Sequence, residues 1–357
     1  MVDQSYINSA DSLTSHLFAS LKRHPKRIVF TEGEDLRVLQ AAEYLVSNQL
    51  IAPILLGDRD KIIAIADENG INRQFINIQN PADSSDLELF CKRLEKIEKY
   101  RGREIDDAKE MITRPHNFAA MMLQYNQADG MVSGNASQPT TIFRALANFI
   151  KPAKDVPKIF GTVALTAPHL NHVGKDGMLL LADCGINPEP SVEELAAIAI
   201  ETGKLAKHLL GHKPRVAMLS HSSHGSMPTA SAKKMQAAAV LARAHAERDY
   251  IDIEIDGEIQ ADVALDMAAA EIKLSDSRAY EPADVLVFPT LDASHIAYKL
   301  LQHVGGANTY GQLIMGLTRH VAQIPKTATV ESIIGTAALV GCESIKSREL
   351  YPEGRDA

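Results

Sequence analysis

Short apolar runs, rich in β-branched residues, alternate along this chain with longer stretches in which apolar residues recur at helical spacing. The short runs include residues 28–30, 54–56, 216–219 and 285–288, and the long stretches include residues 193–210 and 231–247. A strand, a crossover helix and a second parallel strand form the repeating unit of α/β folds, so this alternation predicts an α/β fold with mainly parallel strands.

The length and charge of the chain narrow the classes of protein that it can represent. With 357 residues, the chain is long enough for about two domains with large cores. The net charge of −8 and the pI near 5.9 give no basic field for nucleic acid, which we do not expect as a partner.

No apolar run reaches the roughly 18 residues that span a bilayer, and the N-terminal residues are polar where a signal peptide is apolar. We therefore expect no membrane association and a cytoplasmic location. The three cysteines, Cys91, Cys184 and Cys342, lie far apart and form no metal-ligand or disulfide pattern. Cys184 follows an apolar run, which favours core packing over a role as a nucleophile.

Local signals mark one helix start and two breaks. Ser191 is followed by two glutamates, which predicts an N-cap and a helix from about residue 192. Pro152 and Pro157 interrupt the pattern, and Gly305 and Gly306 end the helix that carries Tyr298 and Lys299. We place the domain boundaries at these two breaks.

One polar segment at a strand end is a candidate for binding an anion. Backbone N–H groups and hydroxyls at such a turn can cradle an anion, although a Ser/Gly-rich turn is more often only a turn. Its candidate residues, which follow the run at 216–219, are Ser220, Ser222, Ser223, Gly225 and Ser226.

Ser133 and Gly134 end another apolar run, and Arg144 follows eleven residues after Ser133. By itself Arg144 reads as either a ligand-binding cation or an exposed helix arginine. Asp256, Glu258 and Asp262 lie close enough in sequence to suggest a metal, but their alternating context favours hydrogen bonding at a turn, and we predict no metal.

Several segments occur in the order and with the content of one enzyme family. The segment at 128–134 reads Ala-Asp-Gly-Met-Val-Ser-Gly, and the segment at 182–188 reads Ala-Asp-Cys-Gly-Ile-Asn-Pro. The others are residues 27–39, 214–226, 256–262 and 285–289. The chain resembles the phosphate acetyl/butyryltransferase family, whose members exchange an acyl group between coenzyme A and inorganic phosphate. The resemblance runs from about residue 25 to about residue 340.

This resemblance implies two α/β domains with an active cleft between them. The first domain would comprise residues 1–153 with 309–357, and the second would be inserted as residues 154–308. It also implies a homodimer that pairs through the second domain, acyl-CoA and phosphate or acyl phosphate as ligands, and no tightly bound cofactor.

The family's catalytic segment is altered in this chain. Aligned without gaps, its catalytic arginine falls on Lys326, its neighbouring serine on Pro325 and its general-base aspartate on Ser332, beside Glu331. Lysine keeps the positive charge but loses the planar guanidinium fork, and a serine hydroxyl cannot act unaided as a base near neutral pH.

The resemblance further implies that Arg144, with Thr140 on the same segment, contacts the phosphate-bearing substrate. It gives Lys326, Arg144, Glu331 and the Ser332 position catalytic roles. The expected substrate-binding residues are Ser133, Gly134, Thr140, Ser220, Ser222, Ser223, Gly225, Ser226, Tyr298, Gly311 and Gln312, the last two standing where the family has Gly-Pro.

Two functions follow from these features and remain open at the level of sequence. The chain is either a phosphate acyltransferase that moves an acetyl or other short acyl group between coenzyme A and phosphate, or a catalytically impaired protein that binds acyl-CoA and regulates. The second reading draws on a likeness to the C-terminal domain of large bacterial malic enzymes, which lacks the same catalytic groups and responds to acetyl-CoA.

Overall fold

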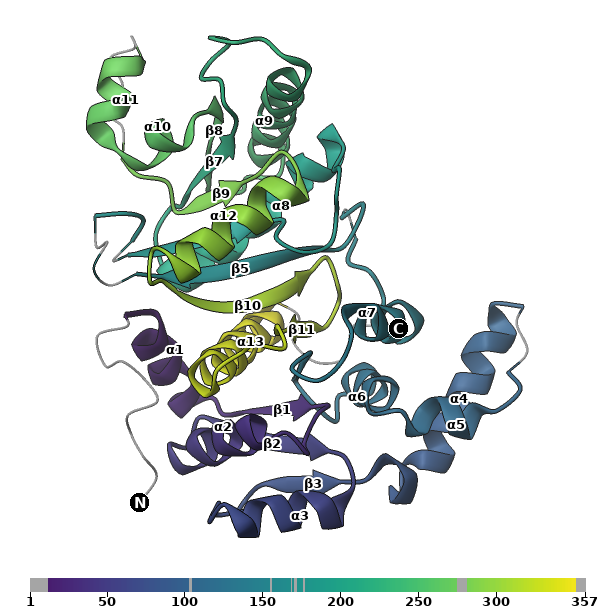
Figure 1. The fold of residues 1–357 in the computed structure, drawn as a ribbon. Helices are drawn as coiled ribbons and strands as arrows, with labels where there is room; N and C mark the ends of the chain where they lie inside the picture. Colours follow the sequence, from purple (N-terminus) through teal and green to yellow (C-terminus); the bar gives the residue numbers. More distant parts are fainter. Residues whose placement is uncertain are drawn as a thin grey trace. The chain divides into compact units, whose positions relative to one another are not determined.

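The computed structural model describes residues 12–102, 105–154, 156–167, 169, 172–175, 177–274 and 281–350. These residues form an α/β fold whose strand pairs are mostly parallel, which confirms the fold class predicted from the alternating pattern (Figure 1). The chain divides into two compact units, of which the second contains residues 152–316 and residues 12–15. The first unit contains residues 16–151 and the chain from residue 317 onward.

The first unit is built on five strands in the order β3-β2-β1-β4-β11, and each adjacent pair is parallel. The strands are β1 (Lys26–Phe30), β2 (Ile51–Leu56), β3 (Asn77–Gln79), β4 (Gly130–Ser133) and β11 (His320–Gln323). The helices of this unit are α1 (Ser12–Arg23), α2 (Leu36–Ser47), α3 (Arg59–Glu68), η2 (Pro81–Asp83), α4 (Leu87–Tyr100), α5 (Ala108–Thr113), α6 (Pro115–Gln124), α7 (Pro139–Phe149) and α13 (Val330–Leu350). The first four residues of α1 belong to the second unit.

Helix α13 packs on β1, β4 and β11 and against α2, while α6 packs on β4 and against α7. Strand β4, which is flanked by β1 and β11, is buried at all four positions, as expected for a parallel strand in the interior of a sheet. The carboxyl ends of β1, β4 and β11 therefore lie side by side at one edge of this sheet.

The second unit has six strands in the order β10-β5-β6-β9-β7-β8. The β6–β9, β9–β7 and β7–β8 pairs are parallel, and β5 is antiparallel to both β6 and β10. The strands are β5 (Phe160–Thr166), β6 (Met178–Ala182), β7 (Arg215–Leu219), β8 (Glu254–Ile259), β9 (Val285–Val287) and β10 (Asn308–Met315). The helices are α8 (Val192–Leu210), α9 (Ala230–Arg248), α10 (Ala261–Leu265), α11 (Met267–Lys273) and α12 (Leu291–His303).

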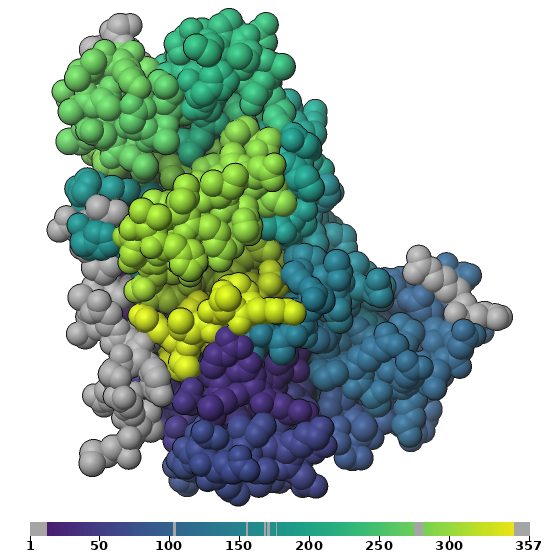
Figure 2. All heavy atoms as spheres, viewed as in Figure 1, coloured from purple at the N-terminus to yellow at the C-terminus, as the bar shows by residue number. Residues whose placement is uncertain are grey.

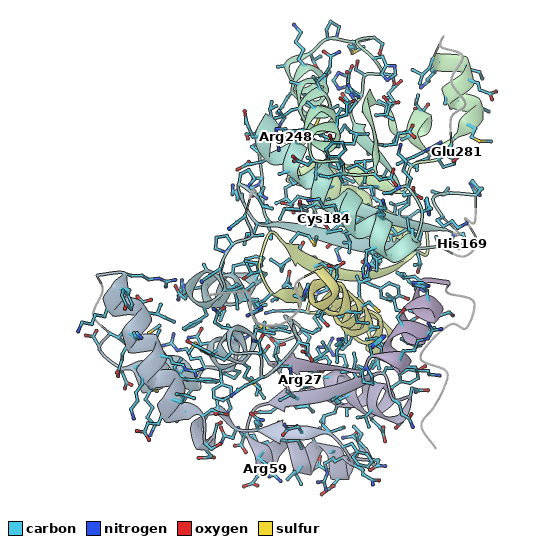
Figure 3. The ribbon with its side chains drawn as sticks, turned by 180° about the vertical axis from the view of Figure 1, so that it is seen from behind. Arg27, Arg59, His169, Cys184, Arg248 and Glu281 are labelled. Carbon is cyan, nitrogen blue, oxygen red and sulfur yellow. The ribbon has the colours of Figure 1, made fainter. Side chains whose placement is uncertain are left out.

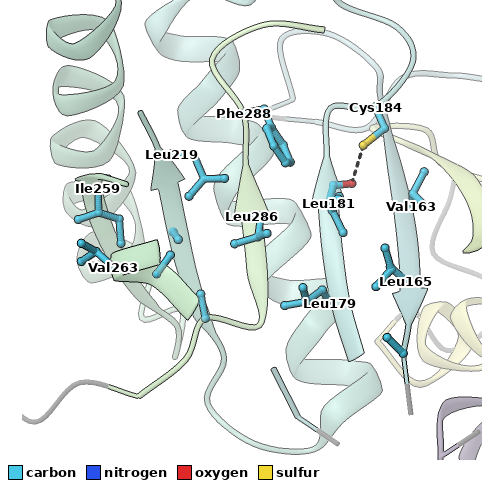
Figure 4. Close-up of a cluster of buried hydrophobic side chains, with 14 of the residues drawn as sticks. Val163, Leu165, Leu179, Leu181, Cys184, Leu219, Ile259, Val263, Leu286 and Phe288 are labelled. Carbon is cyan, nitrogen blue, oxygen red and sulfur yellow. Dashed lines mark hydrogen bonds between the residues drawn. The ribbon is translucent and has the colours of Figure 1, made fainter. Parts of the chain in front are cut away.

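An aliphatic cluster forms the core on one side of the second sheet (Figure 4). Leu181, Leu219 and Leu286 contribute to it from three strands, and Phe288 and Cys184 lie near its edge in the close-up. Cys184 is buried and donates its thiol hydrogen to the Leu181 carbonyl oxygen, while burial raises the pKa of the thiol well above its ordinary value. The interpretation of Cys184 as a core residue is confirmed.

The local predictions for helix ends are also confirmed. Ser191 caps α8 by accepting from the Glu194 N–H, and Glu194 reaches back to the Ser191 N–H. Helix α12 ends at His303, directly before the predicted glycine break. The division into domains at residues 153–154 and 308–309 stays a prediction. Among the described residues, no helix is long and apolar enough to cross a membrane.

Asp183 ties together the turn that follows β6. Its carboxylate accepts hydrogen bonds from the backbone N–H groups of Gly161, Gly185, Ile186 and Asn187, and from the Asn187 side-chain amide, at 2.7–3.2 Å. The side chain is almost fully buried, so these donors have no ready replacement in water.

We expect Asp183→Ala to lower the free energy of unfolding by about 3 to 5 kcal/mol, because it leaves several buried donors unpaired. Urea unfolding followed by circular dichroism measures this change. Asp249→Ala, which removes an exposed ion pair with Arg248, serves as the control and should leave the unfolding midpoint close to that of the wild type. Equal midpoints for the two variants would contradict the structural role of Asp183.

Candidate functional site

The carboxyl edge of the first sheet gathers the polar segments that follow β1, β4 and β11. Strands β4 and β11 are in register, with Ser133 paired to Gln323, and the Ile324 N–H donates to the Ser133 carbonyl oxygen at 2.8 Å. In parallel α/β sheets this edge is where ligands commonly bind.

Gly134 allows the segments after β4 and β11 to touch. Its φ of +127° lies in a region that favours glycine, and a Cβ atom placed there would lie 2.2 Å from the Ile324 carbonyl oxygen. A side chain at residue 134 would therefore force the segment carrying Lys326 away from the segment leading to Arg144.

Glu32, the second residue after β1, contacts the segment that follows β4. Its carboxylate accepts the Gly134 N–H at 2.9 Å and lies 3.6 Å from the Nε2 atom of His116. Beside it, the Thr31 hydroxyl donates to the buried Ser133 hydroxyl at 2.6 Å. Burial alone would raise the pKa of Glu32, but the nearby His116 imidazole and hydrogen bonds from Ser137 and the Gly134 N–H outweigh it, so the pKa lies below its ordinary value.

Arg37, in the first turn of α2, joins three segments. Its guanidinium forms a two-pronged ion pair with Asp35, at 2.7 and 3.0 Å, which keeps the arginine pKa above its ordinary value. It also donates to the carbonyl oxygens of Lys326 and Ala328, each at 2.8 Å, and of Asn135 at 3.4 Å. The same ion pair keeps the pKa of Asp35 low, although burial alone would raise it.

Lys326 and Arg144 are the predicted cations of the site, and both are exposed. Lys326 lies in the turn after β11, and Arg144 lies in α7 one helical turn after Thr140, on the same face. Within the described part of the chain, neither side chain makes a hydrogen bond or an ion pair. Both charges are thus available to an anionic ligand.

Glu331 and Ser332 occupy the first turn of α13, and both are partly buried. The Ser332 N–H donates to the Thr329 hydroxyl at 3.2 Å, an N-terminal cap. Adjacent helical residues project about 100° apart, so Glu331 does not present its carboxylate in the direction of Ser332.

The serine-rich loop after β7, in the second unit, folds around the carboxylate of Glu258. Oε1 of Glu258 accepts the Ser222 hydroxyl at 2.9 Å and the Gly225 N–H at 2.7 Å, and Glu258 itself is almost fully buried. The hydroxyls of Ser220 and Ser226 accept from N–H groups of the same loop, and the Ser223 hydroxyl accepts the Gln260 N–H.

Each backbone N–H from residue 222 to residue 227 therefore already has a protein acceptor. A phosphate could take the Gly225 N–H or the Ser222 hydroxyl only by displacing the buried Glu258 carboxylate, which has a like charge. Anion binding by Ser220, Ser222, Ser223, Gly225 and Ser226 stays a prediction.

Gly311 and Gln312 lie in β10, at a bulge opposite β5. Gly311 has a φ of +99°. The Gln312 side chain is buried over Gly161 and Gly185, where a Cβ atom would come within 2.5 Å and 1.9 Å of it. Tyr298 packs against the aliphatic cluster, and burial, with the Cys184 thiol nearby, raises its pKa to about 12.

The structure thus brings Ser133, Gly134 and Lys326 to one edge of the first sheet, with α7 following on the same segment. Sequence reasoning missed Glu32, His116 and Arg37, although two of these lie in the segment 27–39 that supported the resemblance. In the described part of the chain, no group of three or more His, Cys, Asp or Glu side chains is placed to hold a metal ion.

Comparisons with known proteins agree on one family. The model of the phosphate acetyl/butaryl transferase family matches residues 12–340. A phosphate acetyltransferase of Acetivibrio thermocellus is 32% identical over 333 residues, which cover 93% of this chain and 98% of the relative.

Two solved structures are also similar to this chain. The EutD phosphotransacetylase from Staphylococcus aureus has a TM-score of 0.84 at 31% identity, covering 95% of this chain and 100% of that one. A phosphotransacetylase from Streptococcus pyogenes has a TM-score of 0.84 at 29% identity, covering 94% and 98%.

The lowered pKa of Glu32 leads to a prediction about acid stability. A carboxyl group whose pKa is lower in the folded state stabilises the fold fully above its unfolded pKa, near 4.5, and loses that contribution as the pH falls through the folded pKa. We expect Glu32→Gln to cost about 1 to 3 kcal/mol at pH 7 and progressively less below pH 4.5. Denaturant unfolding from pH 7 to pH 3 measures the difference, and Glu68→Gln controls for the loss of one exposed carboxylate. A cost that grows as the pH falls would contradict the assignment.

Proposed function

The chain belongs to the phosphate acetyl/butaryl transferase family, and on that premise we propose that it transfers an acetyl group between coenzyme A and inorganic phosphate. The observation that supports this function best is the pair of exposed cations, Lys326 and Arg144, which have no partner among the described residues. Both follow strands whose carboxyl ends meet at one sheet edge. Ser133 and Gly134 support that edge, and we retain the other expected binding residues as part of the proposal.

The reaction needs positive charge for two purposes, to bind the phosphate and to stabilise the negative charge that develops on the acyl oxygen. A phosphate oxygen attacks the thioester carbon of acetyl-CoA, a C–O bond forms and the C–S bond breaks. The coenzyme A thiolate leaves and takes a proton from solvent. We assign the binding of the phosphate dianion to Arg144 and the stabilisation of negative charge on the acyl oxygen to Lys326.

Acetyl transfer from acetyl-CoA to phosphate needs little help from a general base, because the attacking oxygen of the phosphate dianion is already deprotonated. The reverse direction requires a proton to leave the thiol, whose pKa is near 8.5. With serine at residue 332, thioester formation should therefore speed up as the pH rises toward that value, unless Glu331 takes over the proton. This dependence on pH is a signature of the altered site.

The regulatory alternative gains no support from the relatives reported above, which are named as transferases. Coenzyme A is a substrate in our proposal, and we keep the prediction of no tightly bound cofactor. None of the three cysteines forms a disulfide in the described part of the chain, which is compatible with the cytoplasmic location that we propose.

We also propose a homodimer that forms through the second unit. Ile296 and Leu300 on α12, and Val304 at its C-terminal cap, recur every four residues, and each is more than half exposed. Figure 2 shows α12, in light green, on the surface of the molecule. An exposed apolar row of this kind suits a symmetric contact with a second copy of the chain.

For the reaction, we expect acetyl-CoA formation from acetyl phosphate and coenzyme A, with kcat/KM reduced about 100-fold or more in Arg144→Ala and in Lys326→Ala. Thioester absorbance measures the rate. Arg248→Ala, an exposed arginine at the end of α9 (Figure 3), and Lys92→Ala are the matched controls and should retain wild-type rates. Saturable acetyl-CoA binding without turnover would favour the regulatory protein instead.

For the dimer, we expect Leu300→Glu to convert a two-chain species into single chains in sedimentation velocity. Val240→Glu, at a similarly exposed position on α9, should leave the assembly unchanged. A wild-type protein that sediments as one chain at micromolar concentration would rule out the proposed contact.

A further inference from the structure

We propose that Arg37 is a positioning residue for Lys326, and that it acts by holding the backbone of the turn that carries this lysine. The inference rests on the proposed function, because it assigns Arg37 a part in the same reaction. Arg37 in this proposal does not touch the substrate, and it affects the reaction only through the Lys326 turn.

The first argument is that the guanidinium directs its N–H groups at acceptors within the protein. The Nε and one Nη2 hydrogen donate to the two carboxylate oxygens of Asp35, and Nη1 donates to the carbonyl oxygens of Lys326 and Ala328. A longer contact joins Nη2 to the Asn135 carbonyl oxygen. Since Asp35 balances its charge, Arg37 is poorly suited to bind a phosphate.

The second argument concerns what else holds the Lys326 turn. Pro325 has no N–H to donate, and the turn contains one internal backbone hydrogen bond, from the Ala328 N–H to the Pro325 carbonyl oxygen at 2.9 Å. The two carbonyl oxygens on either side of Thr327 both point to Arg37, at 2.8 Å. The Lys326 side chain is exposed and gives no anchoring of its own. Arg37 is thus the main restraint on the backbone beneath the reacting cation.

The third argument is geometric. Only a planar fork with several N–H groups can hold Asp35 on one side and two carbonyl oxygens two residues apart on the other, whereas a lysine ammonium is a compact charge. Arg37→Lys therefore keeps the charge and loses the restraint, which separates electrostatics from positioning.

The kinetic test is a double-mutant cycle in acetyl-CoA formation. We expect Arg37→Lys and Arg37→Ala to reduce kcat about 10- to 100-fold while the KM for coenzyme A changes little, because the cation is misplaced rather than lost. In a Lys326→Ala background, Arg37→Ala should cause no further loss. An additional loss of the same size in that background would show that Arg37 does not act through Lys326, and would overturn the proposal.

A second readout does not depend on activity. Trypsin should cleave the Lys326–Thr327 bond faster in Arg37→Lys than in the wild type, and the Ala328 amide hydrogen should exchange faster, both followed by mass spectrometry. The control is Arg59→Lys, in the same unit (Figure 3), since Arg59 likewise donates to a carbonyl oxygen, that of Ile78, at 3.3 Å. Thermal unfolding by circular dichroism confirms that each variant is folded.

Unchanged cleavage and exchange in Arg37→Lys would overturn the positioning role. If the wild-type protein showed no turnover, the proposed function would fail while these two measurements still decided whether Arg37 restrains the turn. The two failures are therefore distinguishable.

Discussion

The close approach of Gly134 to the Ile324 carbonyl oxygen is the contact on which the candidate site depends. Parallel strands β4 and β11 end side by side, and the absence of a side chain at residue 134 lets the two following segments meet. Glu32 then fixes the Gly134 N–H, and Arg37 fixes the backbone after Ile324. The position of the segment that carries Lys326 follows from this junction, so the geometry of the candidate site rests on backbone contacts.

The sequence predicted the fold well because the signals that determine it are local. Alternating strand and helix periods predicted a mainly parallel α/β fold, and Ser191 with Glu194 marked the start of α8. The C-terminal end of α12 and the burial of Cys184 were predicted in the same way. Each of these features depends on residues within a few positions of one another.

The site was predicted only in part, because its contacts join residues far apart in the chain. Arg37 donates to the Lys326 carbonyl oxygen across 289 positions, and no local pattern indicates that bond. The serine-rich loop shows the opposite difficulty. Its composition predicts an anion cradle, but Glu258, which lies on a neighbouring strand, already accepts several of its hydrogen bonds. The composition of a loop shows which hydrogen-bond donors it has. Which acceptors already take those donors is known only from the folded structure.

The packing of Gln312 over Gly161 and Gly185 has an evolutionary consequence. The amide group occupies the volume that a methyl group on either glycine would need. Descendants of this chain that keep glutamine at residue 312 in this conformation therefore need glycine at both other positions, whereas those that move the glutamine side chain or acquire a smaller residue there do not. Residues 161, 185 and 312 should accordingly change together among close relatives, and their joint pattern would mark the lineage in which this version of the strand arose.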